Sequence, residues 1–158
     1  MKKYLVLFLV FAATQAVFSQ KAKITFNGDT AVVDGKPFVI LAKKGGLSAD
    51  LKVKSLNGTA LINFNFQEYD NPNKINSGNP KGRVTYFEIT FLDATGGKCE
   101  ADVFSSKKAI TKLLLEEELI AGNELNPTSV KNFIAIRGTK FSEEKAALNG
   151  PKVIIIEK

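Results

Sequence analysis

Short runs in which apolar and polar residues alternate, separated by pairs of turn-forming residues, occupy most of the chain between residues 23 and 103. In the run around Ile62, Phe64 and Phe66, for example, every second side chain is apolar. This period of two is typical of a β-strand with one face on a core and the other toward solvent. Pairs such as Asn57-Gly58 favour the tight turns of antiparallel hairpins, because those turns need residues that tolerate positive φ. The pattern therefore predicts a mainly antiparallel sheet of about six to eight strands, arranged as a hairpin meander.

The expected strands can be placed by their alternation and by the turn pairs that end them. They cover residues 23–26, 30–33, 38–42, 50–54, 62–67, 86–91 and 98–103, and an apolar run predicts a final buried strand at 153–156. Four phenylalanines at strand spacing are expected to form core rather than a ligand-binding aromatic box: Phe64, Phe66, Phe87 and Phe91.

Helical spacing begins only after the last turn pair of the sheet. Residues 107–121 are predicted as one long helix, with Ser105 or Ser106 as its N-cap. Asn126-Pro127 resembles a second helix start, and the sequence leaves open whether residues 131–137 continue that helix or form a strand. A short helix is expected over 142–148, with Ser142 as its cap.

Together these elements predict one α+β domain over residues 20–158. A mainly antiparallel sheet is covered on its apolar face by one long helix, and shorter helices follow in the C-terminal half. A half-open barrel around the long helix is the main variant of this architecture.

The first twenty residues have the layout of a secretory signal peptide. Lys2 and Lys3 precede an apolar run, and small residues follow it. Cleavage is expected after Ser19, with Ala16 as the second option, and the apolar run is shorter than the roughly 20 residues that span a bilayer. We therefore expect an exported protein, periplasmic or secreted, with no transmembrane anchor after cleavage.

The composition excludes several classes of chemistry. The chain has no histidine, which excludes Ser-His and Cys-His nucleophile pairs and His-ligated zinc. Its one cysteine, Cys99, allows no internal disulfide and is expected to be buried and inert. Residues 1–19 hold two of the 22 basic residues and none of the 16 acidic ones, so the remaining chain carries +4. This mild, scattered charge does not predict a nucleic-acid partner, and no metal or cofactor is expected.

A polar segment rich in Asn, Gly and Pro joins two good strands between residues 69 and 83. It is longer than an ordinary hairpin connection, and such loops are often functional. The candidate residues for binding a ligand or partner are Asp70, Asn71, Asn73, Asn76 and Asn79. Calcium prefers such oxygens, but their spacing does not fit an EF-hand.

Two further sites are predicted near the long helix. Ser105, Ser106, Lys107 and Lys108 place hydroxyls and positive charge at its start, where unpaired amides attract anions. Glu117 lies within the apolar arc of the helix, so its carboxylate needs a partner such as Arg83 or Arg137, or else a pocket that raises its pKa.

No complete catalytic motif is present in the sequence. The prediction is therefore a non-catalytic exported domain that binds a ligand or partner in the cell envelope or outside the cell. One alternative is a small hydrolase or isomerase that uses a Ser-Lys pair or the carboxylates of Glu88, Asp102 and Glu117. Another is a protein inhibitor or adhesin that presents the 69–83 loop.

Overall fold

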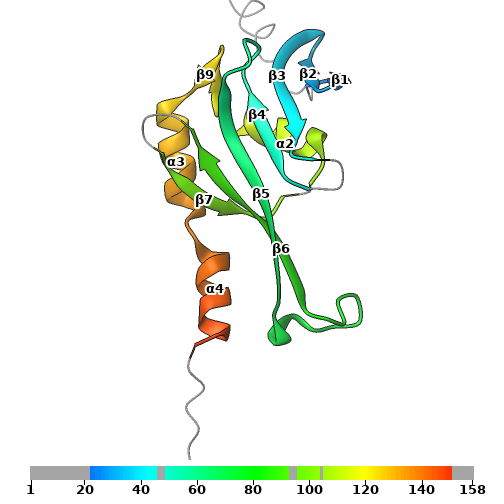
Figure 1. Ribbon diagram of the computed structural model, residues 1–158, viewed down its shortest axis with the longest axis vertical. Helices are drawn as coiled ribbons and strands as arrows, with labels where there is room; N and C mark the ends of the chain where they lie inside the picture. The colour runs from blue at the N-terminus through cyan, green and yellow to red at the C-terminus, as the bar shows by residue number, and fades with distance from the viewer. Residues whose placement is uncertain (1–21, 46–48, 93–95, 104, 151–158) are drawn as a thin grey trace, which may run out of the picture.

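The computed structural model describes residues 22–45, 49–92, 96–103 and 105–150 (Figure 1). The expected signal peptide and the expected final strand at 153–156 lie outside these residues. The described chain contains a seven-stranded sheet made of β1 (Ile24–Asn27), β2 (Thr30–Val33), β3 (Lys36–Lys43), β4 (Leu51–Lys54), β5 (Ala60–Asp70), β6 (Arg83–Phe91) and β7 (Lys98–Ala101).

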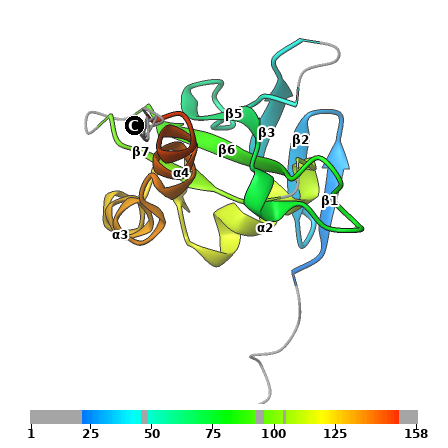
Figure 2. The ribbon, with the colours of Figure 1, turned by 90° about the horizontal axis from the view of Figure 1, so that it is seen from below.

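Each strand of the sheet pairs antiparallel with the next one along the chain. The predicted α+β fold with an antiparallel meander is thereby confirmed. Among the described residues β1 and β7 are the two edges, so the sheet is open. It bends around helix α2 (Lys107–Glu116) (Figure 2).

The turn between β2 and β3 shows why the turn pairs predicted the meander. Val33 pairs with Lys36, so Asp34 and Gly35 alone make the connection. Asp34 has φ +50° and Gly35 has φ +80°. Two positive φ values match the primed turns that fit the twist of a hairpin.

One apolar cluster fills the concave face of the sheet. Phe64, Phe87 and Phe91 are buried there, and the rings of Phe64 and Phe87 meet edge to face at 5.8 Å. Ile110 and Phe133 bring two helices into the same cluster. The four phenylalanines were expected in the core; three are fully buried and Phe66 packs against them half-buried.

The expected helix over 107–121 is shorter in the structure. Helix α2 (Lys107–Glu116) begins after the N-cap Ser106, as expected, but ends five residues early. The amide of Leu119 donates to the carbonyl of Leu114 and that of Glu118 to the carbonyl of Leu115, which closes the helix. A small two-stranded hairpin of β8 (Ile120–Ala121) and β9 (Glu124–Leu125) follows.

Two more helices complete the described chain. Helix α3 (Pro127–Arg137) begins after the N-cap Asn126, which settles residues 131–137 as helix. Helix α4 (Lys140–Leu148) begins two residues before Ser142, so the expected cap at Ser142 is wrong. Thr139 precedes α4 and makes no side-chain cap hydrogen bond, because a carboxylate from the sheet takes that role.

The C-terminal helices lie beside the last strands of the sheet (Figure 1). The connection between α3 and α4 runs along the edge strand β7. There the amide of Glu100 donates to the carbonyl of Gly138 at 2.9 Å. Phe133 of α3 meets Phe91 in the main cluster. Phe141 of α4 stacks on Tyr86, which neighbours Phe87 on β6 and so points to the opposite face of the sheet. The two helices therefore cover opposite faces.

Candidate functional site

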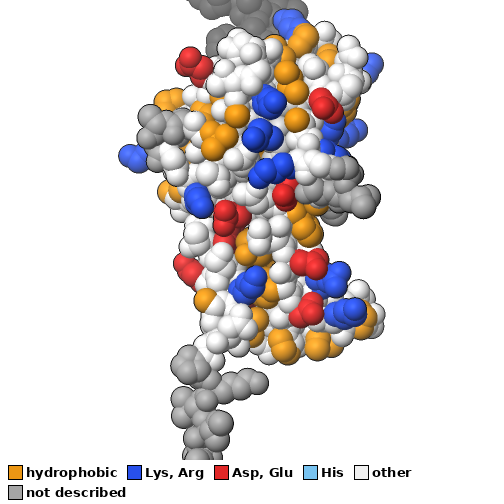
Figure 3. All heavy atoms as spheres, viewed as in Figure 1, with side chains coloured by type: hydrophobic (Ala, Val, Ile, Leu, Met, Phe, Trp, Pro, Cys, Tyr) orange, Lys and Arg blue, Asp and Glu red, His pale blue; other side chains and the backbone are white. Residues whose placement is uncertain are grey.

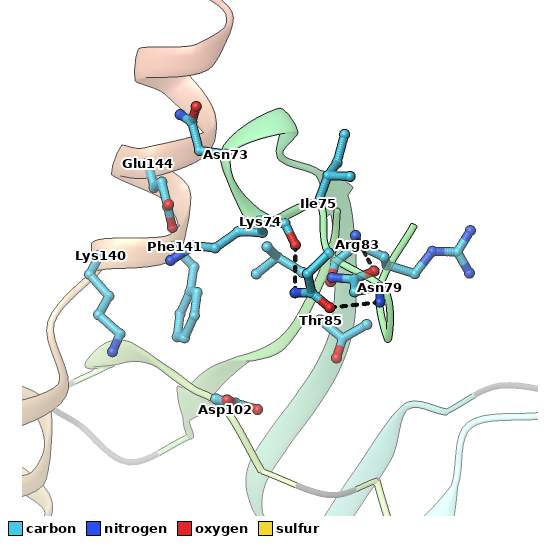
Figure 4. A pocket seen from close by; sticks show the side chains of 12 residues that line it. Asn73, Lys74, Ile75, Asn79, Arg83, Thr85, Asp102, Lys140, Phe141 and Glu144 are labelled. Carbon is cyan, nitrogen blue, oxygen red and sulfur yellow. Dashed lines mark hydrogen bonds between the residues drawn. The ribbon is translucent and has the colours of Figure 1, made fainter. Parts of the chain in front are cut away.

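A cleft of about 750 Å³ lies between the end of the β5–β6 hairpin and α4. We call it the loop–helix cleft (Figure 4). One wall of the cleft is formed by the loop over residues 71–82. The loop is shorter than the expected 69–83 segment, because β5 extends to Asp70 and β6 begins at Arg83. Its volume lies within the roughly 300–1,000 Å³ typical of ligand sites.

Side-chain amides hold the loop in one shape. The oxygen of Asn76 accepts hydrogen bonds from the amides of Gly78 and Asn79 at 2.9 and 3.0 Å. The side chain of Asn79 exchanges two hydrogen bonds with the main chain of Arg83, at 2.9 and 3.0 Å. A short 3-10 helix, η2 (Pro72–Lys74), starts the loop. Hydrogen bonds from its own side chains therefore help to hold the loop in this shape.

Gly82 closes the base of the loop. Its φ is +64°, and a Cβ at this position would lie 2.1 Å from the carbonyl oxygen of Asn71. The amide of Asn71 donates to the carbonyl of Gly82 at 2.8 Å across the same contact. Only glycine satisfies both the positive φ and the close approach.

Glu144 joins α4 to the hairpin. Its carboxylate accepts a hydrogen bond from the hydroxyl of Tyr69 and another from the side-chain amide of Asn71, each at 2.7 Å. Burial, this hydrogen bond and the nearby negative charge raise the pKa of Tyr69 to about 12. The carboxylate of Glu144 thus serves to fix the two walls of the cleft relative to each other.

The cleft carries charges of both signs, and two of its lysines have no ion-pair partner among the described residues. Lys74 and Lys140 form no ion pair in the described chain, and Lys74 extends from the loop toward α4 (Figure 4). The guanidinium of Arg83 points away from the cleft toward Glu68 and Asp70, at 3.8 and 4.0 Å. Asp102 is an exposed acid on the sheet side of the cleft.

The aromatic floor of the cleft is not open for stacking. The ring of Phe141 is stacked on Tyr86, with centroids 5.0 Å apart and planes at 14°. The ammonium of Lys140 lies 4.8 Å from the centroid of the Phe141 ring. Because Phe141 is only 9 % exposed, its ring offers little surface to a ligand.

Of the five loop residues named from the sequence, the structure brings three to the cleft. Asn73, Asn76 and Asn79 line it, whereas Asn71 is buried beneath it and Asp70 lies outside it. Sequence reasoning missed Lys74, Lys140 and Glu144. The spacing of Lys140 and Glu144 predicts a shared helix face, but nothing local links α4 to a hairpin some 70 residues earlier.

Two of the four residues predicted as an anion site at the start of α2 make internal contacts. The hydroxyl of Ser106 accepts from the amide of Ala109 at 3.1 Å, and Lys107 pairs with Asp29. Ser105 is exposed, and Lys108 lines a separate hollow of about 490 Å³ between β1 and α2. The first turn of the helix thus already holds a cap and a counter-ion.

Glu117 lies at the end of α2 and pairs with Arg137, one of the two partners named from the sequence. The two groups are 3.1 Å apart and both side chains are 36 % exposed. They lie beside a small hollow of about 240 Å³ that Glu117 lines.

The three carboxylates that the sequence suggested for an enzyme lie in three separate places. Asp102 lies in the loop–helix cleft, Glu88 pairs with Lys98 on the sheet, and Glu117 lies at the end of α2.

Cys99 is buried in the main cluster, and burial raises the pKa of its thiol to about 12.

In the part of the chain that the structure describes, no group of three or more metal-ligating side chains lies close enough together to hold a metal ion. No helix among these residues is long and apolar enough to cross a membrane. Comparison of the chain with protein-family models, with curated proteins and with solved structures returned no match.

Proposed function

We propose that this protein is an exported, non-catalytic binding domain, and that it holds an acidic segment of a partner protein in the loop–helix cleft. The observation that carries the proposal is the placement of Lys74 and Lys140 on opposite walls of the cleft, both without an ion-pair partner in the described chain. Each ammonium can form a charge-assisted hydrogen bond with a carboxylate, so an acidic segment in the cleft can contact both lysines.

The rigidity of the cleft supports binding rather than a structural role alone. Asn76 and Asn79 fix the loop, and Glu144 ties the loop base to α4. A site that is ordered before its ligand arrives loses little conformational entropy on binding. The separation of Glu88, Asp102 and Glu117 supports a binding function over acid–base catalysis, which needs its groups within reach of one substrate.

The test is an NMR titration of the protein from residue 20 onward with a glutamate-rich hexapeptide. We expect salt-sensitive shifts at the amides of Asn73, Thr85 and Phe141. Replacing both Lys74 and Lys140 by glutamine should weaken binding roughly tenfold, because two charge-assisted contacts are lost.

Lys81→Gln is the matched control, since Lys81 lies in the same loop but does not line the cleft. It should bind the peptide as the unmodified protein does. A glutamine-rich hexapeptide of the same length should bind more weakly. If both peptides bind equally, or if the shifts cluster away from the cleft, the proposal is wrong.

A further inference from the structure

A row of polar side chains crosses the face of the sheet that lies opposite the main core. The strand registers align Lys52 on β4 with Asn63 on β5, then Thr90 on β6, then Lys98 on β7. We call these four residues the Lys52 row. Neighbouring strands are about 4.8 Å apart, so the row is about 14 Å long. Their chain neighbours, such as Val53, Ile62 and Ile89, are buried in the core on the other face.

The middle of the row contains a polar group without a partner. The side-chain oxygen of Asn63 is buried and accepts no hydrogen bond in the described chain. A buried oxygen without a donor is destabilising, so native proteins rarely keep one. A ligand that carries a hydroxyl could supply the missing donor.

The ends of the row are positively charged. Lys52 forms no ion pair in the described chain, and Lys54 follows it on the same face of β4, also without one. Lys98 pairs with Glu88 at 3.5 Å, but its side chain is 60 % exposed. In Figure 3, basic side chains gather over the strands in the upper half of the molecule.

We propose that the Lys52 row binds an acidic polysaccharide. Its negative groups would contact Lys52 and Lys98, and its hydroxyls would donate to Asn63 and exchange hydrogen bonds with Thr90. The side chain of Asn63 is only half-buried as a whole, so rotation of its amide can present the oxygen to a ligand. The missing donor at Asn63 and the unpaired charge of Lys52 match a ligand that carries both hydroxyls and negative charge.

Two other anionic partners fit the row less well. Single-stranded nucleic acids stack their bases on aromatic side chains, and the Lys52 row has none. Membrane surfaces are usually bound through an apolar or aromatic side chain that enters the lipid, and the four side chains of the row are polar.

The test compares the binding of three polymers to the protein from residue 20 onward by isothermal titration calorimetry. Polygalacturonate carries carboxylates and hydroxyls, polyacrylate carries carboxylates alone, and dextran carries hydroxyls alone. We expect binding of polygalacturonate to be at least tenfold tighter than binding of polyacrylate, and no measurable binding of dextran. Equal binding of the two anionic polymers, or binding of neither, would overturn the proposal.

Three variants assign the binding to the row. Lys52→Gln should weaken polygalacturonate binding three- to tenfold, and Glu88→Gln, which frees Lys98, should strengthen it. Asn63→Ala should weaken binding of polygalacturonate but not of polyacrylate. The midpoint of thermal unfolding of this variant should be at or above that of the unmodified protein, because the substitution removes a buried oxygen without a partner in the described chain. Lys81→Gln, in the loop between β5 and β6 but outside the lining of the cleft, is the control and should change nothing.

Vesicles that contain phosphatidylglycerol and a single-stranded oligonucleotide are the competing probes. Tighter binding of either one than of polygalacturonate would show that the row prefers another class of anion, and the proposal would fail. A polygalacturonate affinity that Lys74→Gln reduces, and Lys52→Gln does not, would also contradict it by placing the sugar in the cleft.

Discussion

Glu118 ends helix α2 in a backbone conformation that side chains other than glycine rarely adopt. Its φ is +50°, and it stands at the position where helices that end in this way usually have glycine. The two closing hydrogen bonds, from Glu118 to Leu115 and from Leu119 to Leu114, hold it there. Leu119 and Leu114 are both fully buried, so their contact stabilises the turn despite the strained residue.

Glu118→Gly is therefore expected to stabilise the protein by about 1 kcal/mol, because glycine adopts positive φ without the clash of a Cβ. The measurement is urea unfolding of the variant and the unmodified protein. Glu116→Gly, at the last residue of the helix, is the control and should lower the free energy of unfolding by up to about 1 kcal/mol, because glycine disfavours the helix and the ion pair with Lys112 is lost. A loss of stability in both variants would show that Glu118 is not strained.

The hydroxyl of Tyr69 makes the free energy of unfolding depend on pH in the alkaline range. Its pKa rises from 10.0 to about 12 in the folded protein, so the unfolded chain releases this proton first. The stabilisation is complete below about pH 10 and is lost as the pH rises toward 12. Tyr69→Phe should therefore be less stable than the unmodified protein by about 1.5–3 kcal/mol at pH 7, and the difference should shrink above pH 10. Denaturant unfolding at pH 7, 9 and 11 measures this, and a difference that is constant with pH would contradict it.

The thiol of Cys99 should be unreactive in the folded protein. Burial raises its pKa from 9.0 to about 12, and the thiolate is the reactive form. We expect no modification by a disulfide reagent such as DTNB at pH 8 within an hour, and stoichiometric modification once the protein is unfolded in guanidinium. Rapid reaction under native conditions would show that β7 opens readily at the edge of the sheet.

At the level of elements, the strands and hairpins could be predicted because their signals are local. Each alternating run and each turn pair acts over a few residues, and the meander joins only neighbours in sequence. The end of α2 was missed, because Glu118 occupies a position where the sequence rules expect glycine. The start of α4 was missed for a different reason, since its cap comes from Glu100, some 40 residues earlier.

The candidate site was only partly predictable, for the same physical reason. The composition of the loop pointed to Asn73, Asn76 and Asn79, which do line the cleft. The other wall is supplied by α4, whose position depends on Glu144 and on the stacking of Phe141 against Tyr86. Both contacts join segments far apart in the chain, and no local pattern reports them.

Glu100 is expected to hold the start of α4 on the sheet. It is 3 % exposed, and its carboxylate accepts from the amides of Phe141 and Ser142 at 2.8 and 3.1 Å and from the Ser142 hydroxyl. Glu100→Ala leaves these donors unpaired and removes a negative charge that favours a helix start, so we expect a loss of about 2–3 kcal/mol.

Urea unfolding measures this loss, and hydrogen exchange at the amides of Phe141 and Ser142 shows where it arises. Glu143→Ala is the control, since Glu143 is exposed, lies in the same turn of the helix and, among the described residues, accepts only from the exposed Thr139 hydroxyl, not from the helix amides. It should change stability by less than about 0.5 kcal/mol. Unchanged exchange at Phe141 in Glu100→Ala would rule out the capping role.

At the scale of the whole molecule, two apolar clusters of unequal size lie on opposite faces of one sheet. The larger is filled from α2 and α3, and the smaller consists of Tyr69, Tyr86 and Phe141 with two half-buried neighbours. The long β5–β6 hairpin belongs to both, since its two faces meet different helices. The smaller cluster carries the loop–helix cleft, so opening of the cleft does not require the main core to open.

Phe141→Ala should therefore release α4 and the hairpin end while the rest of the sheet stays folded. The substitution removes the ring that stacks on Tyr86 at 5.0 Å, and few buried residues remain to hold the helix in place. Regions with few buried apolar contacts open locally at low free energy. Hydrogen exchange followed by NMR should show lost protection in α4 and in residues 69–85, with the amides of Leu51, Val53 and Ile89 still protected.

Phe133→Ala is the contrasting variant, because Phe133 packs against Phe91 in the main cluster and is 2 % exposed. A large cavity there should cost about 3–5 kcal/mol and lower protection throughout the sheet. If Phe141→Ala also lowers protection at Leu51 and Val53 by the same factor as at α4, the two clusters unfold as one unit, and the cleft cannot open independently of the core.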